Sequence, residues 1–241
     1  MSRSQRKLAI AIDGPSASGK TTTAKAVARR LGYLHVDTGA MYRALALKAV
    51  REDASLGDAS EVEAFLGGTS VDCVVRAGSC RVLLDGADVT DDIRESDVSL
   101  RSSEIAALPQ VRRWLVARQR KLAAGGGVVM EGRDIGTVVL PDADLKIYLD
   151  AASEERASRR WLEERGTEGD RSRKEVLKEI EDRDHRDMTR ENSPLEVAPG
   201  AVRIDTTSLT IDEQVEEVLR EVKRVLTGGG SGEARCSSES E

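Results

Sequence analysis

The chain has 241 residues, a formal net charge of −6 and only 2% aromatic residues, so its core must rest on aliphatic side chains. The acidic balance argues against a general nucleic-acid binder, and no apolar run approaches the ~18 residues of a membrane-spanning helix. Three cysteines, Cys73, Cys80 and Cys236, lack metal-ligand spacing and are expected as free thiols, although Cys73 and Cys80 could face each other across a hairpin.

The first predicted strand, Leu8–Ile12, leads into a glycine-rich segment and then into an amphipathic helix over Thr22–Leu31. That segment, Gly14-Pro-Ser-Ala-Ser-Gly-Lys-Thr21, matches the pattern G-x-x-x-x-G-K-[ST] at every fixed position. Backbone N–H groups and a helix N-terminus converge in such a turn, so it favours bound phosphate. Lys20 would reach the β- and γ-phosphates and the Thr21 hydroxyl would bind Mg²⁺.

A chance match in an ordinary turn is the alternative, but the agreement of strand, loop and helix favours a nucleoside triphosphate site. The residues expected to bind ATP are Asp13, Gly14, Pro15, Ser16, Ala17, Ser18, Gly19, Lys20, Thr21 and Thr22.

Downstream, a strand at Tyr33–Val36 precedes a helix that runs from Asp37 to about Glu52, and one helical turn is expected at Val62–Leu66. Alternating β-branched runs separated by glycine turns then predict a small antiparallel sheet. Its expected strands are Val71–Arg76, Arg81–Leu84 and a short one at Val89.

The second half alternates helices with short apolar strands, which predicts a parallel sheet covered on both faces and ligands at the carboxyl ends of its strands. Capping boxes at Ser172 and Thr210 mark two helix starts. The expected elements are one or two helices over Ser102–Ala124 interrupted near Pro109, strands at Val128–Glu131, Leu145–Leu149 and Val202–Ile204, and helices over Ser153–Glu164, from Ser172 to about Thr189, and from Thr210 to about Leu226.

One helix carries a row of charged residues at the spacing i, i+3, i+4, i+7, namely Arg183, Arg186, Asp187 and Arg190. A solvated face with internal ion pairs would explain them. Three guanidinium groups and one carboxylate nevertheless leave unpaired positive charge, which favours a phosphate site.

Two further groups allow two interpretations. Arg133 and Asp134 follow a buried strand, where they could form a structural salt bridge or contact different parts of a ligand. Arg156, Arg159 and Arg160 could pair with neighbouring glutamates or close over a ligand.

The phosphate loop and three further segments together resemble the bacterial cytidylate kinase family, within the nucleoside monophosphate (NMP) kinase group. The segments are Asp37-Thr-Gly-Ala-Met-Tyr-Arg43, Glu131-Gly-Arg-Asp-Ile-Gly-Thr-Val-Val139 and Arg183-x-x-Arg-Asp-x-x-Arg190. The resemblance runs from about Leu8 to Leu226 and implies an α/β P-loop NMP-kinase fold. A central parallel sheet flanked by helices would carry a small antiparallel β insertion in the NMP-binding region and a helical lid.

By this resemblance, we expect a single kinase domain over residues 8–226. Its core would comprise 8–36, 101–152 and 200–226, its NMP-binding region 37–100 and its lid 153–199, with residues 1–7 and 227–241 disordered. The implied reaction is Mg²⁺-dependent phosphoryl transfer from ATP to CMP or dCMP in pyrimidine nucleotide metabolism. We expect a cytoplasmic monomer without nucleic-acid or membrane partners.

The resemblance also implies residue roles. Arg43, Arg133 and Arg190, with Thr38 nearby, would hold the CMP phosphate. Asp187 and Arg183 would meet the ribose. Ser103, Arg112 and Asp134 would recognise the cytosine edge. Lys20, Arg133, Arg183, Arg190, Arg156 and Arg160 would form the catalytic set, although which of Arg156, Arg159 and Arg160 enters the site stays open.

Departures from the family pattern are modest. Thr38 stands where serine is frequent, and Glu131 stands where aspartate is usual and is expected not to touch substrate. The acceptor phosphate oxygen is already anionic, so no general base is required. We accordingly expect His35 and His185 to be structural or exposed.

Three alternatives are weighed. An adenylate or shikimate kinase would lack the Glu131–Val139 segment together with the arginine row. A GTPase switch needs an Asn-Lys-x-Asp segment, and Asn192, the only asparagine, is followed by Ser-Pro. A nucleotide-binding regulatory module without turnover is the third.

Overall fold

The computed structural model describes residues 6–76, 79–94, 96–164, 171–190 and 192–228. Its main sheet has five parallel strands in the order β2-β6-β1-β7-β8, so β1 lies at the centre. These strands are β1 (Ala9–Asp13), β2 (Leu34–Asp37), β6 (Val128–Gly132), β7 (Leu145–Asp150) and β8 (Val202–Asp205).

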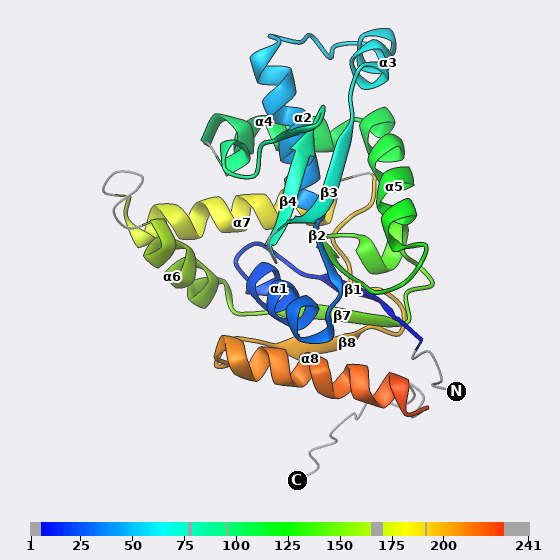
Figure 1. The fold of residues 1–241 in the computed structure, drawn as a ribbon. Helices are drawn as coiled ribbons and strands as arrows, with labels where there is room; N and C mark the ends of the chain where they lie inside the picture. The colour runs from blue at the N-terminus through cyan, green and yellow to red at the C-terminus, as the bar shows by residue number, and fades with distance from the viewer. Residues whose placement is uncertain (1–5, 77–78, 95, 165–170, 191, 229–241) are drawn as a thin grey trace.

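Helices cover the sheet, and several also surround a smaller second sheet (Figure 1). The long helices are α1 (Lys20–Leu31), α2 (Thr38–Arg51), α3 (Ala59–Gly67), α4 (Ser96–Ala107), α5 (Pro109–Ala123), α6 (Ser153–Glu164), α7 (Arg173–Thr189) and α8 (Ile211–Leu226). Two short helices are η1 (Asp92–Arg94) and the π-helix η2 (Ile135–Val139).

The two faces of the sheet bury separate apolar clusters, because successive strand residues point to opposite sides. Ile10 and Ile12 of β1 pack with residues of α1 and α8 on one face. Ala11, between them, belongs to a second cluster that includes residues of α2 and α5. This confirms the predicted α/β class with helices on both faces of a parallel sheet.

The small sheet is antiparallel, in the order β3 (Val71–Arg76), β4 (Ser79–Leu84) and β5 (Ala87–Asp88). Its register pairs Cys73 with Val82 and Cys80 with Val75, so the two cysteines do not face each other as the hairpin interpretation allowed. Cys73 is a buried free thiol.

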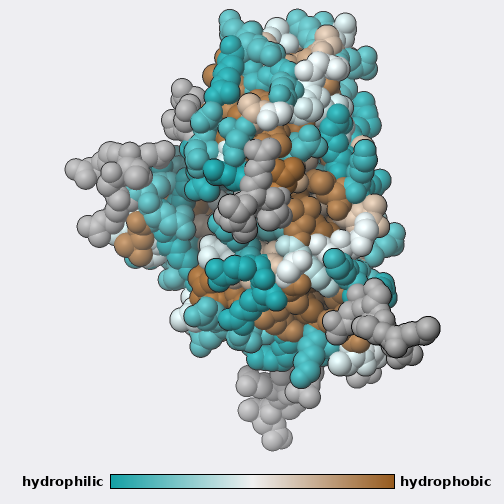
Figure 2. Space-filling view, in the orientation of Figure 1, coloured by the Kyte–Doolittle hydropathy of each residue, from teal (hydrophilic) through white to brown (hydrophobic). Residues whose placement is uncertain are grey.

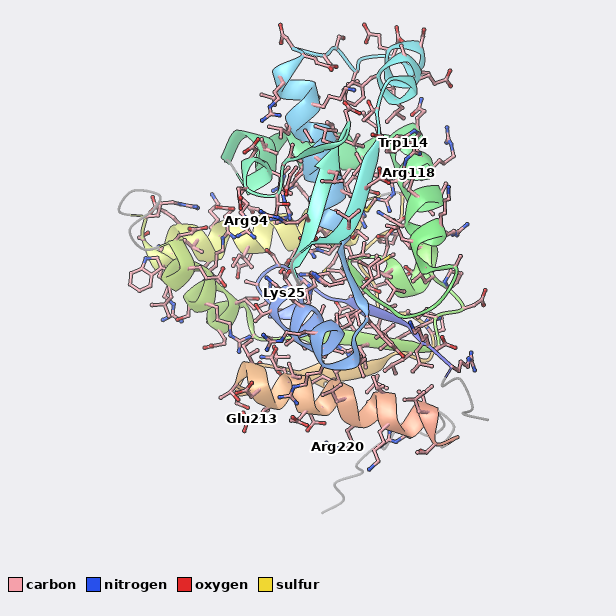
Figure 3. The ribbon with its side chains drawn as sticks, viewed as in Figure 1. Lys25, Arg94, Trp114, Arg118, Glu213 and Arg220 are labelled. Atoms are coloured by element: carbon pink, nitrogen blue, oxygen red, sulfur yellow. The ribbon has the colours of Figure 1, made fainter. Side chains whose placement is uncertain are left out.

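Most helix boundaries follow the predicted signals. Ser172 and Thr210 form reciprocal capping boxes with Glu175 and Glu213, and Glu213 is labelled at the start of α8 in Figure 3. Pro109 separates two helices, since proline cannot donate a helical hydrogen bond. The first of them begins at Ser96, earlier than the predicted Ser102.

On α5 the Arg118 guanidinium stacks on Trp114, 3.1 Å from the ring centroid (Figure 3). Figure 2 shows hydrophilic residues over most of the visible face, with apolar residues emerging mainly beside β3 and where α1 meets α8. None of the described helices is long and apolar enough to cross a membrane.

Candidate active site

The phosphate loop joins β1 to α1, as its sequence predicts, and its geometry demands glycine at the first position. A Cβ on Gly14 would lie 2.1 Å from the backbone oxygen of Leu149. No side chain caps the N-terminus of α1 and its first turn holds no acidic residue, whereas glutamates close the N-termini of α3, α7 and α8. The positive end of α1 is therefore left for an anion.

Two buried groups in the loop also fit bound phosphate. The Oγ of Ser18 is buried without a hydrogen-bond partner among the described residues. The ammonium of Lys20 is buried and donates to the Pro15 carbonyl at 2.7 Å. Burial, together with Arg133, lowers the pKa of Lys20 to about 7. A buried cation held beside other cations is stabilised when a polyanion enters the site.

The arginine row on α7 divides in two. Arg183 lies close to other cations, and burial followed by the charge of Arg133 lowers its pKa to about 10, with Arg43 and Arg160 adding to the effect. Arg186 is exposed and donates to the backbone oxygen of Asp182. The structure thus brings Arg183 to the site and leaves Arg186 outside it.

Asp187 and Arg190 complete the inner part of the row. The Arg133 guanidinium donates to Asp187 at 2.8 Å and, although burial opposes it, holds the pKa of that carboxyl below its usual range. Arg190 follows α7, and its buried NH2 group lacks a hydrogen-bond partner in the described part of the chain. Burial and the charge of Arg112 lower the pKa of Arg190.

The start of α2 meets the end of β6 beside these groups. The Thr38 hydroxyl donates to the backbone oxygen of Glu131 at 2.7 Å. Arg43 pairs with Asp37 at 2.9 Å, and this contact lowers the pKa of Asp37 although burial alone would raise it. Thr38 and Arg43 therefore lie where the resemblance implies a phosphate site.

The residues expected to recognise the base are only partly together. Arg112 and Asp134 form a buried ion pair, and the Arg112 guanidinium lies 5.9 Å from the centroid of Tyr42. Burial raises the pKa of Tyr42 to about 12. Ser103 lies exposed on α4, and no contact with this pair is found within the described residues.

The three arginines of α6 have different surroundings. Arg156 is buried, pairs with Asp184 of α7 and donates to the backbone oxygen of Ser16 at 3.1 Å. Arg159 donates to the backbone oxygen of Thr206 at 2.6 Å. Arg160 is exposed and pairs with Glu164. The segment 165–170, which contains the expected lid loop, lies outside the described residues.

Sequence reasoning missed the contacts of two carboxylates at the site. Asp13, expected to bind ATP, accepts the backbone N–H groups of Ile135 and Gly136 at 2.8 and 2.7 Å. Glu131 accepts the Thr21 hydroxyl at 2.8 Å. A glycine-rich turn after a buried acidic residue, and an acidic residue at a strand end, are the signals that could have indicated these roles.

A cavity of about 470 Å³ adjoins the loop and was not predicted either. Ala17 and Thr22 of the loop, Arg159 of α6, and Thr210 and Gln214 around the start of α8 are among its lining residues. Its position beside the α1 N-terminus suits the nucleoside part of a bound triphosphate.

Taken together, an uncapped phosphate loop faces a group of cations at the carboxyl ends of parallel strands. This arrangement defines a P-loop kinase of the nucleoside monophosphate kinase class, which brings two phosphorylated molecules together. The family model for cytidylate kinase matches residues 10–224. The chain belongs to the cytidylate kinase family.

Curated relatives agree with this assignment. A cytidylate kinase of Caldicellulosiruptor saccharolyticus is 48% identical over 92% of this chain and 98% of its own length. One from Desulfitobacterium hafniense is 51% identical over 89% and 92% of the respective chains. A solved gluconokinase from Sinorhizobium meliloti covers 93% of this chain and 96% of its own at 18% identity, and its TM-score of 0.45 adds nothing to the assignment.

Proposed function

We propose that this chain transfers the γ-phosphoryl group of ATP to CMP or dCMP and so forms ADP with CDP or dCDP. The family assignment supports this reaction. The observation that carries it is the group of cations around Lys20 and Arg183, whose pKa values are lowered by burial and by neighbouring positive charge. Such a site is completed by phosphate oxygens on both sides of a transferring group.

In the proposed mechanism, the loop 14–21 and Lys20 hold the ATP phosphates. Arg43, Arg133 and Arg190 hold the CMP phosphate, with Thr38 nearby, and Arg183 stabilises the charge that develops between the two molecules. Asp187, held by Arg133, contacts the ribose together with Arg183. Positioning and charge stabilisation account for the catalysis, because the acceptor oxygen needs no base.

Mg²⁺ is the cofactor of this reaction, and the residues present fit it. The Thr21 hydroxyl and the Glu131 carboxylate meet beside the phosphate loop and offer the oxygen ligands that Mg²⁺ prefers. The bound ion would bridge phosphate oxygens of ATP and neutralise part of their charge. Thr21 would bind the ion, and Glu131 would orient Thr21.

The Arg112–Asp134 pair supports selection of cytosine. The cytosine N4 amino group is a donor that the Asp134 carboxylate can accept, whereas uracil presents a carbonyl oxygen at the same position. Within this proposal, residues 37–100 form the NMP-binding region and residues 153–199 the lid of one kinase domain. We also propose that the enzyme is a cytoplasmic monomer acting on free nucleotides.

An ADP-release assay with ATP, Mg²⁺ and a panel of ribo- and deoxyribonucleoside monophosphates tests the function. CMP and dCMP should be the preferred acceptors. Lys20→Ala serves as the inactive control, since it removes the cation that contacts the phosphates. Absence of turnover with every pyrimidine monophosphate would rule out the proposed reaction.

A further inference from the structure

His35 lies on the sheet face that α1 covers. In the parallel pairing of β2 with β6, His35 is opposite Val129, and Val129 packs in the apolar cluster that contains α1 residues. Glu131, two residues further along β6, points to the same face because strand side chains alternate. That face brings Glu131 beneath the first turn of α1, where Thr21 stands.

The Glu131 carboxylate connects two other side chains through its two oxygens. Its Oε1 lies 2.9 Å from Nε2 of His35, and its Oε2 accepts the Thr21 hydroxyl at 2.8 Å. Glu131 is only 1% exposed, so water has little access to these contacts. An ionised carboxylate only accepts hydrogen bonds, so His35 carries its proton on Nε2 and donates it.

We propose that His35 is a positioning residue for Mg²⁺, acting by holding the Glu131 carboxylate against the hydroxyl of Thr21. The inference rests on the proposed function. A threonine hydroxyl that binds a cation must offer an oxygen lone pair and direct its proton elsewhere. Glu131 accepts the hydrogen bond from that proton, and His35 fixes the carboxylate so that it can do so.

The arrangement follows the general design of metal sites, in which groups behind the ligands orient them and their loss typically costs ~10–100-fold in metal affinity. It differs from a purely structural contact in one respect. His35 should matter for the binding of ATP with Mg²⁺ and not for the binding of ATP alone.

The test measures the Kd of ATP by calorimetry, once in EDTA and once in excess Mg²⁺, without acceptor. His35→Leu removes the donor at similar volume, and His35→Gln keeps an N–H near the position of Nε2. We expect His35→Leu to bind ATP normally in EDTA and to lose ~10–100-fold of the gain that Mg²⁺ provides. His35→Gln should retain most of that gain.

The exposed His185 offers a matched control on α7, and His185→Leu should leave both Kd values unchanged. Should His35→Leu fail to fold, His35→Asn replaces it, because its amide is too short to reach Glu131. Thermal melting of every variant separates lost stability from lost Mg²⁺ dependence.

A double-mutant cycle tests the route through Glu131. Glu131→Asp shortens the side chain, so that one carboxylate no longer spans His35 and Thr21. In the Glu131→Asp background, His35→Leu should have no further effect on the Mg²⁺ dependence.

Two results would overturn the inference. Equal losses of ATP affinity with and without Mg²⁺ would make His35 a support of the fold alone. An unchanged Mg²⁺ dependence in His35→Leu would leave it without a role at the metal. Because no acceptor is present, neither result bears on the proposed function, which fails only if the wild-type enzyme phosphorylates no pyrimidine monophosphate.

Discussion

Arg112 and Asp134 neutralise each other inside the proposed base site, and this pairing has a functional consequence. Both side chains are buried, so each keeps the other from being an uncompensated charge in the ligand-free protein. When a base enters, the pair can share its hydrogen bonds with the ligand at little cost. Removing one charge should therefore affect recognition as well as stability.

Asp134→Asn should reduce the preference for CMP over UMP. The amide can turn its N–H₂ group towards the uracil carbonyl, which the carboxylate cannot do, so the discrimination should fall by ~10–100-fold, as for an unpaired buried group of about 1–3 kcal/mol. Steady-state kinetics with both acceptors measure the ratio of kcat/KM values. Asp142→Asn, at an exposed aspartate, is the matched control. Unchanged discrimination in Asp134→Asn would remove this residue from base recognition.

Asp13 gives a pH-dependent prediction. Burial raises its pKa to about 6 from 3.8, although its two backbone hydrogen bonds oppose the shift. The folded protein thus holds this proton more tightly than the unfolded chain. The resulting stabilisation is complete below about pH 4 and is lost as the pH rises through about 6.

The variant Asp13→Asn tests this dependence, because an amide at this position has no proton to lose. The free energy of unfolding of wild type minus that of Asp13→Asn should fall by about 3 kcal/mol between pH 4 and 7, as about two pKa units correspond to. Urea denaturation across this range measures the difference. A difference independent of pH would show that Asp13 titrates normally in the folded protein.

The arginine row shows what residue spacing can and cannot predict. The i, i+3, i+4, i+7 pattern places Arg183 and Arg186 on one side of a helix. Which of them turns inward depends on how α7 packs, and only Arg183 lies among the site cations. Likewise, the sequence marks Glu131 as a strand-end acid, but its contact with Thr21 depends on the distant placement of α1.

At the scale of elements, α6 and α7 pack against the phosphate loop. Ala157, Val176 and Ile180 form a small core between the two helices, and Ala17 of the loop packs against it. The Arg156–Asp184 pair adds polar contacts, because both side chains also bind the backbone of Ser16. The position of the loop is therefore linked to that of the two helices.

Arg156→Ala and Arg160→Ala should consequently differ. The first leaves Asp184 as a buried unpaired charge and should cost about 3–5 kcal/mol of stability. The second removes an exposed group whose charge acts on Arg183, and should lower kcat with little change in melting temperature. Urea denaturation and kinetics on both variants measure these effects. A stable Arg156→Ala protein with wild-type affinity for ATP would contradict the proposed link.

Local sequence signals predicted the elements where they act locally. The capping boxes at Ser172 and Thr210 and the break at Pro109 are short-range effects, and the structure confirms them. The π-helix η2 was not predicted. Its first N–H groups are held by Asp13, which is far away in the sequence, so no local pattern marks it.

At the scale of the whole molecule, the topology explains how an acidic protein contains a cationic centre. The chain carries a net charge of −6, yet β1, β2 and β6 end side by side and deliver the phosphate loop, α2 and the Arg133 turn to one edge of the sheet. Burial and like charges lower the pKa values of Lys20 and Arg183 there. Their charged forms are thus destabilised until anions arrive.

Substrates should therefore stabilise the protein strongly. At concentrations about 100-fold above Kd, a ligand adds ~2.7 kcal/mol to the free energy of unfolding. For a chain of this size, that corresponds to a rise of roughly 5–10 °C in Tm. Calorimetry with CMP, and with NaCl at equal ionic strength as the control, measures the shift.

Arg183→Met separates specific binding from screening. Without ligand, this variant should melt no lower than wild type, because a guanidinium that burial and other cations disfavour has been replaced by an apolar side chain. With CMP it should gain less in Tm than wild type, since one of the groups that the ligand compensates is missing. If NaCl raised the wild-type Tm as much as CMP did, general screening would explain the stabilisation and the cationic centre would not be a nucleotide site.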